Sequence, residues 1–215
     1  VISIGDSSQV SVGDPVLAIG SPLGLANTVT QGIVSSLNRP VTTGTTDSQS
    51  FVDAIQTDAA INPGNSGGAL VDAAGRMIGV NSAIATLGAS SGSQSGNIGL
   101  GFSIPITEAK RVIDELITEG KSYRPVLGVF FDSTYTGIGA KIARLSPNEG
   151  ADNAGVPAGS VIRVIDGVKI PDMETAIVRI RALAPGSSVS ITVDLPAGGQ
   201  KTFKITLGKA ISSAS

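Results

Sequence analysis

Short apolar runs separated by turn residues fill the first hundred positions of the chain. The first run covers residues 15–19 and ends at a Gly-Ser-Pro turn. Further runs of strand-forming residues recur at 28–37, 51–56, 69–71, 77–80 and 100–104. Residues 42–50 and 87–97 are rich in polar residues and glycine and predict surface loops. Short strands with turn signals between them are typical of an antiparallel barrel or sandwich.

A helical period replaces this pattern between residues 107 and 119. Five apolar residues fall on one face of that helix: Ala109, Val112, Ile113, Leu116 and Ile117. Thr107 is a suitable N-cap, and Gly120 is a suitable end because glycine adopts the left-handed conformation without strain. The sequence therefore predicts a helix that closes a first domain, which we place at residues 1–121.

The second half of the chain predicts a small β-rich domain with one good helix, at residues 122–210. Strands are expected at 126–131, where a glycine interrupts the apolar run, and at 139–145, 160–165, 189–193 and 201–207. Asp166-Gly167 is a hairpin-turn signal. Asp172 is a suitable N-cap for a helix. The apolar side of that helix carries Met173, Ala176, Ile177 and Ile180. Residues 211–215 are expected to form a tail.

Composition argues against several classes of function. The 215 residues include 15 Lys and Arg against 17 Asp and Glu, and this balance argues against nucleic-acid binding. Aromatic residues make up 3%, too few for base-stacking platforms. Because the chain has neither cysteine nor histidine, it forms no disulfide, and we expect no transition-metal site and no cofactor. No apolar run approaches the roughly 20 residues of a membrane span.

Ser66 is the candidate nucleophile. It lies in the run Gly64-Asn65-Ser66-Gly67-Gly68, ahead of an apolar strand. The glycines allow a tight loop whose N–H groups point inward, so those of Gly64 and Ser66 can form an oxyanion hole. A serine nucleophile of this type needs an imidazole base, and the chain contains no histidine. Taken alone, the motif leaves a plain glycine turn as the alternative.

Longer stretches around this motif resemble the HtrA/DegP-type serine proteases. The insertions resemble those of actinobacterial members. The similar segments are 55–62, 64–70, 78–81 and 99–105 in the first half and 127–129 and 154–162 in the second. The resemblance implies a mainly β chain that comprises the C-terminal barrel of a chymotrypsin-like protease domain, a closing helix and a PDZ domain. In that family the catalytic His and Asp lie on a first barrel, which would precede Val1.

The resemblance assigns active-site roles to few residues. Ser66 matches the nucleophile, and Gly64 and Ser66 match the residues whose N–H groups form the oxyanion hole. Ile61 and Ile84 match positions that line the pocket for the side chain before the scissile bond. Both are apolar and β-branched, so the pocket is expected to accept small or medium aliphatic side chains.

Three polar residues near Ser66 are not assigned to the triad. Neither Asp53 nor Asp58 matches the position of its acid. Asn65 stands where trypsin-like zymogens carry an aspartate that pairs with a newly freed amino terminus, and an amide cannot form that ion pair. We therefore expect loop rearrangement to control activity, with residues 87–97 as a candidate loop.

The second half carries the candidate peptide-binding residues. Leu127-Gly128-Val129 resembles the PDZ loop whose N–H groups receive the carboxylate at the end of a peptide. The alternative for this segment is an ordinary strand interrupted by glycine. Ile177 and Ile180 are candidates for the peptide groove, with core packing as the alternative.

The function implied by the resemblance is that of a serine endopeptidase for unfolded or misfolded proteins in the periplasm or cell envelope, with PDZ recognition of C-terminal peptides. This chain alone is expected to be inactive because the His and Asp of the triad are missing. The alternatives are a catalytically silent peptide-binding fragment and an incomplete product with no independent role. A trimer-based homo-oligomer and an upstream membrane anchor are expected of the intact parent only.

Overall fold

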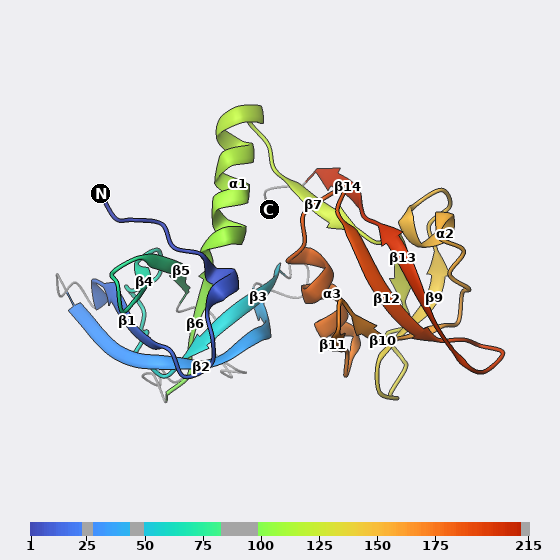
Figure 1. The fold of residues 1–215 in the computed structure, drawn as a ribbon, viewed down its shortest axis with the longest axis horizontal. Coiled ribbons are helices and arrows are strands. Elements are labelled where there is room, and N and C mark those ends of the chain that lie inside the picture. The colour runs from blue at the N-terminus through green and yellow to red at the C-terminus, as the bar shows by residue number, and fades with distance from the viewer. Residues whose placement is uncertain (23–27, 44–49, 83–98, 212–215) are drawn as a thin grey trace. The chain divides into compact units, whose positions relative to one another are not determined.

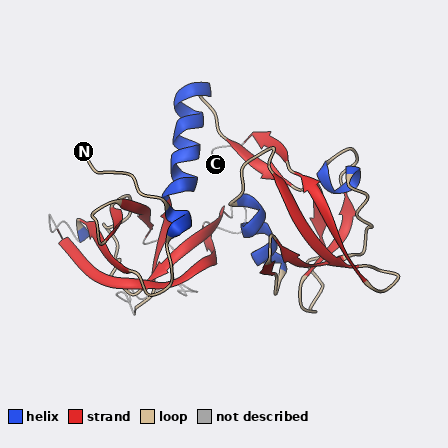
Figure 2. Cartoon of the chain, in the orientation of Figure 1, coloured by secondary structure: helices blue, strands red, loops and turns tan. Residues whose placement is uncertain are grey.

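The computed structural model describes residues 1–22, 28–43, 50–82 and 99–211 (Figure 1). The chain divides into two compact units, Val1–Asp114 and Glu115–Ser215, which we call unit 1 and unit 2. Strands dominate both units and helices are few, so the predicted mainly β architecture is confirmed (Figure 2). Ile84 and the predicted loop at 87–97 lie outside the described residues.

Unit 1 contains a closed antiparallel barrel with the strand order β1-β2-β3-β6-β5-β4. The strands are β1 (Pro15–Gly20), β2 (Thr28–Thr43), β3 (Ser50–Thr57), β4 (Ala69–Asp72), β5 (Met77–Ser82) and β6 (Gly101–Pro105). Every strand expected in this half is present. The second strand is longer than expected, because β2 continues to Thr43 through register shifts opposite β3.

The barrel is filled by alternate residues of its strands. Val16 and Ala18 of β1 are buried, whereas Leu17 and Ile19 beside them face outward and are exposed. The buried cluster comprises Val16, Ala18, Val34, Ile55, Ala59, Ile61, Leu70 and Ile78. Fully burying an aliphatic side chain of this size contributes about 1.5–3 kcal/mol, so this cluster is the main stabilising element of unit 1.

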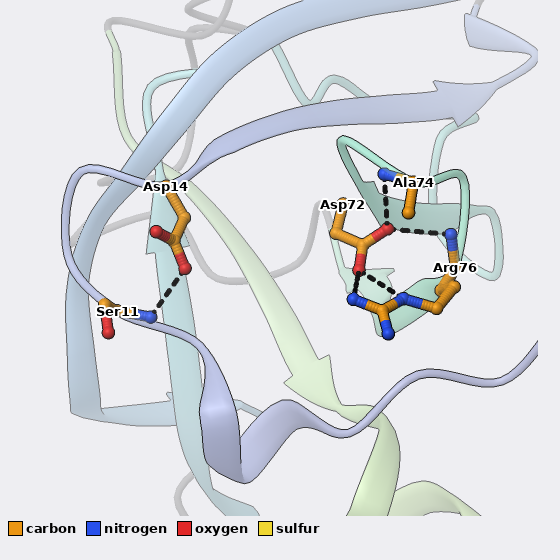
Figure 3. Close-up of polar contacts among 5 residues, drawn as sticks. All are labelled: Ser11, Asp14, Asp72, Ala74 and Arg76. Carbon is orange, nitrogen blue, oxygen red and sulfur yellow. Dashed lines mark hydrogen bonds and ion pairs between the residues drawn. The ribbon is translucent and has the colours of Figure 1, made fainter.

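Two exposed turns of unit 1 are held by aspartate carboxylates (Figure 3). Between β4 and β5, Asp72 accepts hydrogen bonds from the N–H groups of Ala74 and Arg76, both at 2.9 Å, and pairs with the Arg76 guanidinium at 2.8 Å. Ahead of β1, Asp14 accepts from the N–H of Ser11 at 2.8 Å. These contacts satisfy turn N–H groups that have no partner in the strand ladders.

Helix α1 (Ile106–Glu119) follows β6 directly. It begins one residue earlier than expected, so the prediction of Thr107 as its N-cap is wrong. Thr107 lies in the first turn, and its hydroxyl hydrogen-bonds that of Ser7 in the short helix η1 (Ser7–Gln9) at 2.7 Å. A contact distant in sequence therefore sets the position of this residue. Gly120 follows the helix at φ 70°, as expected.

The apolar face expected for α1 is largely uncovered. Ile113, Leu116 and Ile117 are exposed, and Ile106 is the one buried residue of the helix. Among the described residues, no helix combines the length and hydropathy needed to span a membrane.

Unit 2 is built on a twisted sheet with the strand order β13-β12-β10-β9-β8, and β11 pairs with β10 beside this path. The strands are β8 (Val129–Phe131), β9 (Ala140–Leu145), β10 (Val161–Ile165), β11 (Val168–Lys169), β12 (Ser188–Asp194) and β13 (Gln200–Thr206). A separate ladder joins β7 (Tyr123–Val126) to β14 (Gly208–Ile211). The helices are α2 (Gly150–Asn153), which was not expected, and α3 (Met173–Arg181).

Local turn and cap signals of unit 2 are confirmed. Asp166 and Gly167 take positive φ values of 46° and 79° between β10 and β11, as a tight hairpin requires. Asp172 caps α3 by accepting a hydrogen bond from the Thr175 N–H at 2.8 Å. These features depend on neighbours in sequence, which explains why they were predictable.

The strand expected at 126–131, interrupted by glycine, is divided into two strands with different partners. The chain turns at Gly128, whose φ is 82°, and the two sides of the turn join different ladders. Before the turn, β7 pairs with β14, and after it, β8 pairs with β9. The glycine in the run indicates an interruption but not the change of pairing partner, because the partners lie far away in sequence.

Candidate active site and peptide-binding loop

Ser66 lies at the tip of the loop between β3 and β4. Gly64 and Gly67 on either side have φ values of 101° and 85°, which side-chain-bearing residues rarely adopt. Inside the loop, the N–H of Asn65 donates to Asn62 O and that of Gly68 donates to Asn65 O, both at 2.9 Å. The loop is therefore a closed turn with an exposed serine at its tip.

Backbone contacts from two other strands hold this loop. The N–H of Gly67 donates to Asn81 O at 3.0 Å, and the N–H of Asn81 donates to Gly68 O at 2.8 Å. Ser21, just after β1, donates its N–H to Gly64 O at 3.4 Å. Within the described part of the chain, the Gly64 N–H has no acceptor. A donor left open beside a serine is the arrangement that an oxyanion hole needs.

Asn65 is buried beneath the loop. Its exposed fraction is 1%, and its side-chain amide donates to Ala60 O at 3.3 Å. The Thr30 hydroxyl donates to the same carbonyl at 2.9 Å. The side chain rests on Gly20, where a Cβ atom would lie 2.4 Å from Asn65 Oδ1. Asn65, which directly precedes Ser66, is thus tied to the segment that leads into the loop.

Asn81 is the residue near this site that sequence reasoning missed. Its side-chain amide donates to Ile19 O at 3.1 Å and Ala69 O at 3.0 Å, and its Oδ1 accepts from the Ser103 hydroxyl at 2.9 Å. It therefore joins β1, β4 and β6 around the nucleophile loop. An amide inside an otherwise apolar strand, Ile78-Gly79-Val80-Asn81, was the available signal.

The remaining predicted residues of unit 1 lie as follows. Ile61 is buried in the barrel cluster, and its Cδ1 atom lies 3.0 Å from where a Cβ of Gly101 would stand. Asp58 Oδ1 accepts the Ile33 N–H at 2.7 Å, which is a structural contact. Asp53 is buried on β3 at 6% exposure.

In the described ranges, no group of three or more His, Cys, Asp or Glu residues could hold a metal ion.

In unit 2, the first two carbonyl groups of the loop Leu127-Gly128-Val129 point to the same side. Leu127 O accepts from the Ala151 N–H and Gly128 O from the Ser146 N–H, both at 2.9 Å. In a trans peptide the N–H points opposite to the carbonyl, so the N–H groups of Gly128 and Val129 point away from residues 146–151. Two adjacent donors facing the same way can receive a carboxylate.

The strand after this loop is at the edge of its sheet. β8 pairs with β9 and is the last strand in the order. The bond from Ser146 to Gly128 makes Val129–Leu145 a non-hydrogen-bonded pair, so the N–H and C=O of Val129 face the open edge. Ile177 of α3 is half-buried, whereas Ile180 is 5% exposed and belongs to the core. Ile177 is therefore the one of the two with side-chain surface left for a ligand.

Comparison with known proteins agrees with this geometry. The model of the family described as "Trypsin-like peptidase domain" matches residues 1–80. The chain is 55% identical over 212 residues to "Serine protease PepD" of Mycobacterium tuberculosis, covering 97% of this chain and 46% of that protein. It is 40% identical over 215 residues to "Probable periplasmic serine endoprotease DegP-like" of Bartonella henselae, covering 96% and 40%.

A solved structure described as "HtrA-type protease AlgW with tripeptide" superposes with a TM-score of 0.62 at 35% identity, covering 97% of this chain and 69% of that one. The chain spans about half the length of the curated relatives that it matches. The likeness thus extends through both units, and its identity is high enough to carry more than the fold. The chain belongs to the HtrA/DegP-type, trypsin-like serine proteases.

Proposed function

We propose that this chain is part of a serine endopeptidase that degrades unfolded or misfolded proteins in the cell envelope. The observation that carries the proposal is the exposed Ser66 between two left-handed glycines, beside the open N–H of Gly64. In this proposal Ser66 is the nucleophile and the N–H groups of Gly64 and Ser66 form the oxyanion hole. Ile61 and Ile84 line the pocket for the residue before the scissile bond.

The two units take different parts in this proposal. Residues 1–121 are the second barrel of a chymotrypsin-like protease domain, and residues 122–210 are a PDZ domain. The division between the compact units falls inside α1, a few residues before the proposed boundary. The chain contains no histidine, so the triad base must come from outside it. Alone, the chain is therefore catalytically inactive.

The test joins this chain to a first barrel that carries a His and an Asp. The combined protein is expected to cleave unfolded casein, and Ser66→Ala is expected to remove that activity. Asp58→Asn is a matched control, because Asp58 lies close in sequence but serves as a backbone acceptor. Cleavage that persists in the Ser66→Ala protein would refute the assignment of the nucleophile.

A second function, peptide binding by unit 2, is favoured by the open edge of β8. A peptide can add to this edge as a further strand, and its terminal carboxylate can reach the N–H groups of Gly128 and Val129. Ile177 faces the ligand in this arrangement, and Leu127, which is 3% exposed, anchors the loop in the core. This function needs no residue outside unit 2, so it is the one expected of the chain by itself.

Paired peptides test this binding. A peptide with a free, apolar C-terminus is expected to bind with a Kd on the order of micromolar, because the contact is small and the peptide must be ordered. The same peptide with an amidated C-terminus is expected to bind markedly more weakly. Amide chemical shifts in NMR report both titrations. Equal affinities would exclude the carboxylate loop while leaving strand addition possible.

The proposed location is supported by a relative's name, whereas the proposed assembly rests on the family resemblance alone. One relative is named periplasmic, which supports a place in the cell envelope. The peptide present in the AlgW structure supports polypeptides as the ligands. A trimer-based homo-oligomer is proposed for the intact protein, and sedimentation of that protein tests it.

A further inference from the structure

The carboxyl group of Glu108, in the first turn of α1, has no part in the site described above. Its Oε2 atom is buried and has no hydrogen-bond partner among the described residues. An ionised carboxylate without a partner is expensive to bury, so such a group usually takes up a proton instead. The proposed protease function does not explain why this carboxyl oxygen is buried without a partner.

A second carboxyl group, that of Asp53, comes to the same end of the barrel. Ile55 of β3 pairs with Ser103 of β6, and the two strands are antiparallel. Residues before Ile55 and residues after Ser103 consequently extend in the same direction. Asp53 lies on the first of these segments and Glu108 follows the second. Asp53 is 6% exposed, and Glu108 is half-buried with its Oε2 atom out of water.

We propose that Glu108 and Asp53 form a proton-binding carboxyl pair at the junction of β6 and α1, in which Glu108 carries the proton below neutral pH. Two carboxylates in one poorly solvated place do not both ionise readily, because each charge disfavours the other. The charged groups that act on Glu108 are Arg111, from the next turn of α1, and Asp53, from β3. The net effect favours the neutral acid.

The direction of the titration agrees with this geometry. Burial raises the pKa of Glu108 from 4.5 to about 7, the charge of Arg111 opposes the rise, and the charge of Asp53 adds to it. A carboxyl group whose pKa is higher in the folded state contributes stability that is fully present below its unfolded pKa. That stability is lost as the pH rises through the folded pKa. Unit 1 therefore loses stability between about pH 4.5 and pH 7, the two values named above.

The pair gives α1 a pH-dependent attachment to the barrel. Below neutral pH the neutral Glu108 can be buried without repulsion from Asp53. At alkaline pH the two negative charges repel, and the first turn of α1 moves outward to hydrate Glu108. Unit 1 thus carries a built-in response to pH, separate from any titration of a catalytic triad.

A direct test is a carbon-13 NMR titration of the side-chain carboxyl groups in the full chain. The Glu108 signal, identified by its loss in Glu108→Gln, is expected to titrate near pH 7. Glu119, at the exposed end of the same helix, provides the reference signal for comparison. A Glu108 midpoint at the ordinary glutamate value would overturn the proposal.

Two charge variants test the pair from opposite sides. Arg111→Gln removes the opposing cation and is expected to raise the Glu108 midpoint. Asp53→Asn removes the neighbouring anion and is expected to lower it. If the buried Asp53→Asn protein fails to fold, the Arg111→Gln variant and the wild-type titration still test the proposal. Shifts that are absent or reversed would overturn the assigned partners.

Stability provides a separate readout. The unfolding constant of unit 1 is expected to rise by up to about tenfold per pH unit between pH 5 and 7 and to level off above pH 8. Glu108→Gln is expected to flatten this dependence, whereas Glu119→Gln is not. Methyl NMR signals of Ile78 and Ile106 follow unit 1 specifically, since both tyrosines lie in unit 2 and the chain has no tryptophan. An unchanged dependence in Glu108→Gln would contradict the proposal.

Discussion

The hydroxyl of Ser103 donates a 2.9 Å hydrogen bond to Asn81 Oδ1 inside the barrel of unit 1, and both residues are buried. The Asn81 amide group makes two further bonds, to Ile19 O and Ala69 O. One side chain thus satisfies all of its polar atoms with three strands. Its backbone also holds Gly67 and Gly68, directly after Ser66.

Ser103→Ala is expected to destabilise unit 1 by about 1–3 kcal/mol, because it leaves Asn81 Oδ1 buried without a donor. Urea unfolding followed by the methyl signals of unit 1 measures this loss. Ser35→Ala, at a half-buried serine of β2, is the control and is expected to have a small effect. A loss no larger in Ser103→Ala than in Ser35→Ala would mean that this bond contributes little.

Ser160→Ala is not expected to reduce stability, in contrast to Ser103→Ala. Ser160 is 0% exposed, and its hydroxyl oxygen has no hydrogen-bond partner among the described residues. Because burying an unpaired hydroxyl is unfavourable, its removal is expected to leave unit 2 unchanged or to stabilise it by up to about 1 kcal/mol. Tyrosine fluorescence during urea unfolding reports unit 2. A clear loss of stability would indicate that the hydroxyl has a partner in solution.

Gly128→Ala is expected to destabilise unit 2 more than Gly167→Ala does. Both glycines have a φ near 80°, so both substitutions carry the backbone strain of roughly 1–2 kcal/mol. At Gly128 the new Cβ would also lie 2.3 Å from Glu149 Cβ, whereas at Gly167 nothing lies within 4 Å. The difference between the two unfolding free energies therefore isolates the steric clash. Equal losses would show that Glu149 moves aside at little cost.

This clash affects how peptide binding is tested. A substitution at Gly128 changes the packing of the loop against Glu149 as well as the space for a ligand. Loss of binding in such a variant would not by itself identify a carboxylate site. The comparison of free-acid and amidated peptides leaves the protein unchanged and is therefore the sharper experiment.

The isolated chain is expected to show no hydrolysis of casein above background at neutral pH, because it contains no histidine. A protease that loses one triad member keeps a rate roughly 10³–10⁴-fold above that in water, and here the first barrel's share of substrate binding is also missing. A fluorogenic casein assay measures the rate, with Ser66→Ala as the blank. Robust turnover in the chain that vanishes in Ser66→Ala would mean that another group serves as the base.

Local features of this protein could be predicted from its sequence because each depends on residues close together in the chain. The hairpin turn at Asp166-Gly167 requires two positive φ values, and the cap at Asp172 needs only the N–H three residues later. The glycines around Ser66 likewise specify their turn by themselves. The short apolar runs and the turn signals between them were sufficient to place the strands of the barrel, although β2 is longer than expected.

Other features were decided by the tertiary structure. The strand expected at 126–131 is divided because β7 and β8 find different partners, and α1 starts at Ile106, with Thr107 held by Ser7 about one hundred residues away. The polar network of Asn81 and the burial of Glu108 also arise from strands that meet only in the fold. Sequence patterns encode local conformation and the choice between apolar and polar surroundings. They do not encode which distant backbone groups will complete a hydrogen bond or which charges will share a buried site.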